Sequence, residues 1–163
     1  MSTIIDTLVT NRTQADVERV QALAAKGFAA MTADEQAEWL TGMKGAYNAA
    51  DLNRVGTALN YLAGRLGVIC GRSITWTAKT DWAVTDIITA SQAEAYRKQV
   101  QSIRDALTYP AGTPDAPELG RLTYTGANDI ERILTLCEEL IDNVAKSFRH
   151  TGAAECAAGG LLT

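Results

Sequence analysis

The stretch from Asn48 to Gly67 constrains the fold most strongly. Asn48 is a favourable helix N-cap, and Asp51 falls in the first turn, near the positive end of the helix dipole. Apolar residues then recur at alternating spacings of three and four: Leu52, Val55, Leu59, Leu62 and Leu66. Such a continuous apolar face predicts the central helix of a helical domain, and Gly67 stands where a left-handed helix terminator is expected.

Four further segments carry helix signals. Thr13 opens a helix that ends at Gly27, and Thr32 with Glu35 forms a capping box for a helix that ends near Thr41. Ser91 with Glu94 suggests a second capping box, for a helix that ends before Pro110. The longest helix is expected from about Gly126 to Arg149, with Gly152 as its stop and an apolar face of Ile130, Ile133, Leu134, Cys137, Leu140, Ile141, Val144 and Phe148.

Between the central helix and Lys79 the pattern changes. Residues 73–77 alternate polar and apolar side chains, which favours an extended segment or one short hairpin. The predicted fold is therefore all-α in the main: a bundle of about five helices with a minor extended or β-hairpin element near residues 68–78. We expect a single helical domain over 13–152, an N-terminal arm over 1–12 that forms an extra helical turn or docks elsewhere, and a C-terminal arm over 153–163.

Composition narrows the class of partner. A net charge of −4 argues against nucleic acid, which needs a concentrated positive field. The N-terminus lacks a signal-peptide pattern, and no apolar run approaches the ~20 residues of a membrane span, so we expect synthesis in a cytoplasm and no membrane insertion. The three widely spaced cysteines do not suggest a disulfide framework.

Enzyme chemistry has little support in the sequence. None of the common nucleophile, zinc-protease, P-loop or dinucleotide motifs is present, and the single histidine, His150, fits a helix C-terminus. The pairs Asp34/Glu38 and Glu138/Asp142 have a spacing that a metal could use, but such pairs on an outward face are usually only solvated. We expect no catalytic residue, no cofactor and no metal, hence no enzyme.

Surface candidates are more informative. Gly56, Asn60 and Gly64 recur every four residues on one flank of the central helix, where interior glycines favour close approach by another part of this chain or by a neighbouring subunit. Aromatic side chains in irregular segments are interface anchors or lids on the core. The predicted interface residues are Ile4, Ile5, Leu8, Gly56, Asn60, Gly64, Trp76, Trp82, Tyr109, Tyr124, Leu161 and Leu162.

Several motifs together resemble a known group. They lie at 11–17, 31–40, 44–48, 51–55, 79–82, 122–124 and 128–131. In this order they are similar to small helical proteins or modules encoded among tail and baseplate genes of phages and prophages of Firmicutes-type bacteria. The resemblance covers roughly residues 10–150. The group supplies no catalytic residue that could be transferred to this chain.

The resemblance implies a non-enzymatic virion component of the tail tip, baseplate or fibre-attachment region. Such a protein would be made in the host cytoplasm and would contact copies of itself and other virion proteins, through the arms and the proline-rich loop near residue 110. The alternative is a soluble adaptor or host-interaction module that binds a receptor or carbohydrate through its aromatic loops.

Overall fold

The computed structural model describes the backbone of residues 2–159 and the side chains through residue 148. Within that range the chain forms six α-helices and no strand. They are α1 (Thr3–Asp6), α2 (Gln14–Lys26), α3 (Ala33–Thr41), α4 (Ala49–Cys70), α5 (Ala90–Ala106) and α6 (Tyr124–Gly159), with short 3-10 turns η1 (Phe28–Ala30) and η2 (Leu119–Arg121). The predicted all-α helical bundle is confirmed, whereas the β-hairpin is absent from the described chain.

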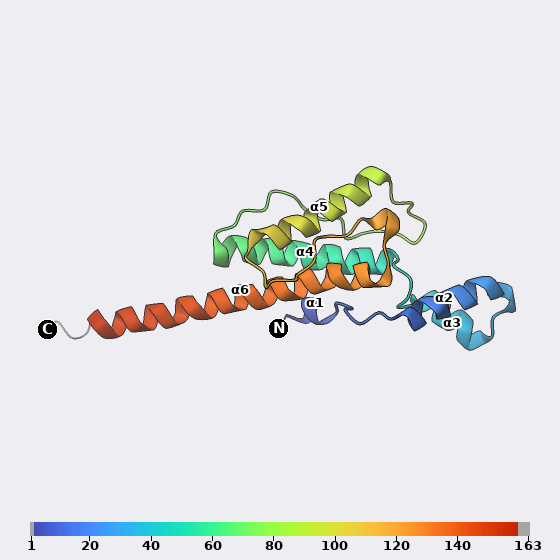
Figure 1. The fold of residues 1–163 in the computed structure, drawn as a ribbon, viewed down its shortest axis with the longest axis horizontal. Coiled ribbons are helices and arrows are strands. Elements are labelled where there is room, and N and C mark those ends of the chain that lie inside the picture. The colour runs from blue at the N-terminus through green and yellow to red at the C-terminus, as the bar shows by residue number, and fades with distance from the viewer. Residues whose placement is uncertain (1, 160–163) are drawn as a thin grey trace.

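Helix α4 lies at the centre, as its apolar face predicts. Val55, Leu59, Leu62 and Leu66 are each 0% exposed. They pack with the apolar faces of α5 and α6 in one continuous core, which also takes in Ile5 of α1. Figure 1 shows α4, α5 and α6 side by side. Burying a side chain of this size contributes about 1.5–3 kcal/mol, so this face contributes strongly to stability.

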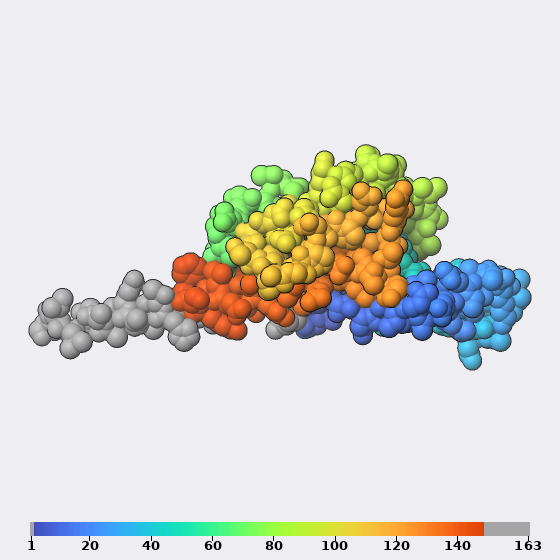
Figure 2. Space-filling view, in the orientation of Figure 1, coloured from blue at the N-terminus to red at the C-terminus, as the bar shows by residue number. Residues whose placement is uncertain are grey.

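Helices α2 and α3 form a separate hairpin with a small core of their own. Leu23, Met31 and Met43 are buried together, and Val20 and Trp39 pack against them. This hairpin projects from one end of the molecule (Figures 1 and 2). Gly45, in the link between α3 and α4, packs directly on the backbone of α2. A Cβ atom at Gly45 would lie 2.1 Å from the carbonyl oxygen of Asp16.

The predicted helix starts are mostly confirmed by their caps. Thr13, Thr32 and Asn48 each form a capping box with the residue three positions on. The start of α5 differs: its cap is Thr89 with Gln92, not Ser91 with Glu94. Two capping-box patterns overlap here, and the earlier one starts the helix two residues sooner.

Three predicted helix details are wrong. Helix α4 continues through Gly67 to Cys70 and ends at Gly71, which has the left-handed φ of 64°. Helix α6 continues past Gly152 to Gly159, because a single glycine costs only about 1 kcal/mol in an alanine-rich helical sequence. Phe148, assigned to the core face of α6, is 66% exposed, because α6 extends beyond the other helices there (Figure 1).

The segment after Gly71 explains why the hairpin prediction was wrong. Its side chains do alternate, with Ile74, Trp76 and Ala78 turned to the core and the residues between them exposed. Its backbone, however, pairs with asparagine side chains of α4 instead of a second strand. Asn60 accepts a hydrogen bond from the Ala78 N–H (2.7 Å) and donates to the Ala78 carbonyl (3.0 Å).

Candidate functional site

The apolar residues of the N-terminal arm lie on the chain's own body. Ile5 is 2% exposed in the main core, and Ile4 and Leu8 pack against the same core. The arm thus forms the extra helical turn α1, which closes one side of the α4–α6 pair. Leu161 and Leu162, the predicted contacts of the C-terminal arm, lie outside the described residues.

The glycine flank of α4 contains two kinds of position. Gly56 is buried, and a Cβ atom there would lie 2.3 Å from the Lys79 carbonyl oxygen. Asn60 holds Ala78, as described above. Gly64 is exposed and has no atom within 4 Å of an added Cβ atom. Close approach therefore occurs at Gly56 and Asn60, where residues 72–82 cross the helix. We call this segment the connector.

The predicted aromatic anchors mostly cover the core. Trp82 and Tyr109 are 8% and 9% exposed. Trp76 is half-buried and donates a hydrogen bond from Nε1 to Ser102 Oγ at 2.9 Å. Tyr124 is half-buried at the start of α6 and lines a pocket.

The most exposed aliphatic side chains were not among the predicted interface residues. Val84 is 95% exposed and Ile87 is 89% exposed, and both lie in the loop between the connector and α5. We call residues 83–88 the apolar loop. A short aliphatic pair near turn residues has no periodicity, so sequence patterns do not distinguish it from a lid on the core.

The apolar loop is well fixed. At its base, Asn53 accepts from the Trp82 N–H (2.7 Å) and donates to the Trp82 carbonyl (2.9 Å). Asp86 accepts from the Ala83 N–H at 3.0 Å and from Lys79 Nζ at 3.4 Å. The Ala83 hydrogen bond, followed by the Lys79 interactions, lowers the pKa of Asp86. Lys79 Nζ also lies 4.5 Å from the centre of the Trp82 ring.

A small apolar pocket lies beside this loop. It has a volume of about 190 Å³, and we call it the hairpin pocket; its lining is Val20, Trp39, Gly42, Met43, Ala46 and Asn48. A second hollow of about 240 Å³ lies between the start of α4 and the apolar loop and is lined by Val84 among others. Asn48 lines both, so the hairpin pocket and the hollow that Val84 lines are neighbours.

A buried charge cluster anchors the arm to α4 and α6. Arg12, 4% exposed, pairs with Asp51 at 2.9 Å and with Glu131 at 2.6 Å. Arg54 pairs with the same two carboxylates. Glu131 is 0% exposed and also accepts a hydrogen bond from the Val9 N–H at 2.5 Å. Two positive and two negative charges balance here, which is the condition for burying ions.

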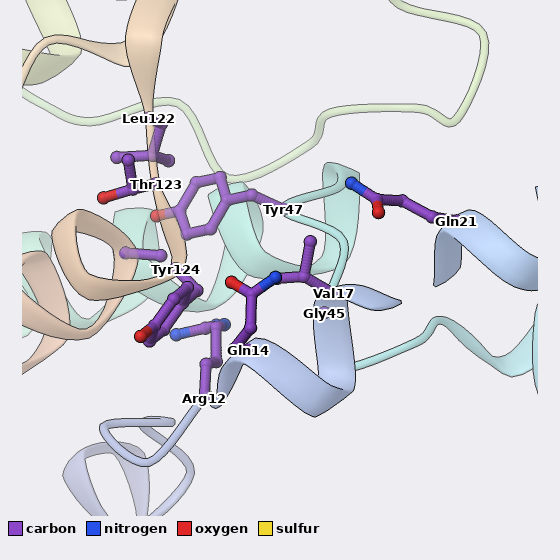
Figure 3. Close-up of a pocket in the computed structure, with 10 residues that line it drawn as sticks. Arg12, Gln14, Val17, Gln21, Gly45, Tyr47, Leu122, Thr123 and Tyr124 are labelled. Atoms are coloured by element: carbon purple, nitrogen blue, oxygen red, sulfur yellow. The ribbon is translucent and has the colours of Figure 1, made fainter. Parts of the chain in front are cut away.

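A pocket of about 320 Å³ lies next to this cluster (Figure 3). Arg12 and Tyr124 lie close together on one side of it, and the ring of Tyr47 forms another wall. Burial raises the pKa of Tyr47, whose hydroxyl hydrogen-bonds that of Tyr96 at 2.5 Å, so the pair is neutral at ordinary pH. The full lining is Arg12, Gln14, Val17, Gln21, Gly45, Tyr47, Leu122, Thr123, Tyr124 and Ala127.

Three of the four carboxylates in the predicted pairs contact arginines, and Glu138 is buried, not on an outward solvated face as expected. Glu38 pairs with Arg19 at 2.7 Å, and Arg65 bridges Glu138 (2.6 Å) and Asp142 (2.9 Å). Among the described side chains, no group of three or more histidines, cysteines or carboxylates is placed to hold a metal ion. None of the helices in the described range combines the length and apolar content needed to cross a membrane.

No protein-family model matches this chain, and no curated protein or solved structure is significantly similar to it.

Proposed function

We propose that this chain is a non-enzymatic structural subunit of a phage virion, in the tail tip, baseplate or fibre-attachment region. It would be made in the host cytoplasm and would act by contacting copies of itself and other virion proteins. The motif resemblance supplies the virion context. The observation that carries the proposed mode of action is the apolar loop, because it holds Val84 and Ile87 almost wholly in water.

Exposed aliphatic side chains in a fixed loop favour a contact surface. A flexible loop could fold such side chains back onto the body, but this one is held in place. The Asn53 amide hydrogen-bonds the Trp82 backbone, and the Asp86 carboxylate accepts from the Ala83 N–H. Covering each side chain on assembly would contribute about 1.5–3 kcal/mol. The loop is therefore ordered before binding, which lowers the entropy cost of association.

The outline of the molecule also suits assembly. The α2–α3 hairpin projects at one end and the last turns of α6 extend at the other (Figure 1). Most residues of the hairpin are exposed or half-buried, so it offers a contact surface to neighbouring subunits.

The test is the composition of virions. Particles induced from the bacterium that encodes this chain would be purified on a density gradient, and the chain would be quantified by mass spectrometry against the major tail protein. We expect a fixed ratio of the chain to the tail protein across the particle fractions. Recovery of the chain only from the particle-free fraction would refute the proposal.

The pocket in Figure 3 favours the alternative, an adaptor or host-interaction module. Its volume of about 320 Å³ lies at the small end of ligand pockets, and its walls combine two tyrosines with amide and hydroxyl groups. Tyrosine rings and glutamine amides suit a neutral sugar. Titration of a monosaccharide panel by NMR would test this, with Tyr124→Ala to remove one wall. Shifts confined to the pocket and lost in Tyr124→Ala would support it.

A further inference from the structure

We propose that the apolar loop of one copy of this chain inserts into the hairpin pocket of a second copy, and the reverse, in a two-fold symmetric contact. This inference rests on the proposed structural function, for which it names one partner and one surface. The loop supplies Val84 and Ile87 as projecting side chains. The pocket supplies an apolar recess, and it shares Asn48 with the hollow that Val84 lines.

The two parts match in size and in polarity. A volume of about 190 Å³ is below the range of about 300–1,000 Å³ for small-ligand pockets, but it suits one or two aliphatic side chains. Val20, Trp39 and Met43 give it apolar walls, and Met43 and Trp39 belong to the small core of the hairpin. Methionine adapts its shape easily to an incoming side chain.

Their adjacency points to a second copy and to two-fold symmetry. In a two-fold contact the same patch meets itself, so a projection and its recess must both lie within that patch. Asn48 lines the hairpin pocket and the neighbouring hollow that Val84 lines, which puts both parts within one patch. An unrelated partner would need only one of the two.

Charges at the edges of this patch are complementary. Asp81, beside the loop, has a side chain that is 87% exposed, and its pair with Lys79 is long at 3.6 Å. Lys44, next to Met43 of the pocket, is 38% exposed, and its pair with Asp16 is also long at 3.5 Å. Neither pair saturates its charge. When the loop of one copy enters the pocket of the other, Asp81 of the first copy approaches Lys44 of the partner subunit.

The first experiment is sedimentation equilibrium of the full chain. A two-fold contact predicts a mass twice the 17.4 kDa of one chain. Ile87→Asp places a charge where the pocket is apolar, and we expect it to weaken dimerisation at least about tenfold. Ser73→Asp is the matched control, because it adds the same charge at an exposed position of the same connector and should leave dimerisation unchanged.

Charge reversal tests the register of the contact. Lys44→Asp and Asp81→Lys should each weaken dimerisation several-fold, and the double variant should recover most of the loss. Circular dichroism melting of each variant would verify that the fold is retained. Because both positions are exposed and form only surface ion pairs, we expect each change to alter stability by less than about 1 kcal/mol.

Three results would overturn the inference. They are a wild-type chain that stays monomeric up to about 100 µM, a dimer that Ile87→Asp does not weaken, and a double charge reversal that is no better than its single variants. Each of these leaves the virion proposal standing if the chain is present in particles. Conversely, a dimer that behaves as expected while the chain is absent from particles would refute the virion proposal alone.

Discussion

The side-chain amide of Asn60 binds the backbone of Ala78 at two points, as a paired strand would. Asn53, two helical turns earlier, does the same with Trp82. The asparagines are seven positions apart, which is about 10.5 Å along a helix, and their partners are four positions apart, which is about 13 Å along an extended chain. The connector therefore runs antiparallel to α4, and the helix itself satisfies its backbone.

Removing one of these asparagines should loosen the connector. Asn60→Ala loses two hydrogen bonds and leaves the N–H and carbonyl of buried Ala78 unpaired, so we expect a loss of about 2 kcal/mol in the free energy of unfolding. Urea denaturation would measure it. Asn143→Ala is the control, because Asn143 is an exposed asparagine on α6, and it should change stability by less than about 0.5 kcal/mol. Equal losses of unfolding free energy in the two variants would contradict the role of Asn60 in holding the connector.

Gly56 and Gly64 of α4 should respond in opposite directions to replacement by alanine. Gly56→Ala places a methyl group 2.3 Å from the Lys79 carbonyl oxygen, a contact that forces the backbone to move. We expect a destabilisation of about 1–3 kcal/mol. Gly64→Ala meets open space within a helix and should stabilise the chain by up to about 1 kcal/mol.

Thermal unfolding of both glycine variants would separate the two interpretations of this flank. A lower melting temperature for Gly64→Ala would mean that something approaches it closely in solution. In that case a neighbouring subunit would be the natural source of the contact.

Removing Arg12 should be costly, because it leaves Glu131 buried with Arg54 as its remaining ion-pair partner. Breaking a buried pair typically costs about 3–5 kcal/mol, and Arg54 should keep the loss for Arg12→Ala near the lower figure. Arg19→Ala is the comparison, since Arg19 is 46% exposed and pairs with an exposed Glu38. It should cost less than about 1 kcal/mol. Guanidinium denaturation giving similar values for both variants would argue against the anchoring role of Arg12.

Cys137 should be unreactive in the native chain. Burial raises the pKa of its thiol to about 11 from the ordinary value of 9.0, which lowers the thiolate fraction at pH 8 roughly a hundredfold. A Cys70→Ser/Cys156→Ser variant would report Cys137 alone to Ellman's reagent. We expect slow labelling in buffer and rapid labelling in denaturant.

The same pKa shift carries a sign for stability. A raised pKa in the folded state means that its contribution is fully present below the unfolded value and is lost as the pH rises toward about 11. The free energy of unfolding should therefore fall between about pH 9 and pH 11, and less so in Cys137→Ser. A Cys137→Ser/Cys156→Ser variant would give the labelling rate of half-buried Cys70 for comparison. Native Cys137 that reacts as fast as Cys70 would contradict the burial of Cys137.

Local chemistry determined much of this fold from the sequence. The caps at Thr13, Thr32 and Asn48 and the apolar face of α4 depend on residues three or four positions apart, so the sequence contains them in full. The ends of the helices were harder to predict, because several residues can end a helix. Gly67 and Gly71 are both able to end α4, and the segment that follows decides between them.

Tertiary structure decided what lies between the helices. The alternation at residues 73–77 predicted an extended segment or a hairpin, but not that asparagines of α4 would take the place of a second strand. Tertiary structure also brought Arg12 to Glu131, 119 positions away, and set the apolar loop beside the hairpin pocket. Spacing along a chain fixes the contacts within one turn of helix. Pairings between distant residues depend on how whole helices pack, and only the folded chain specifies them.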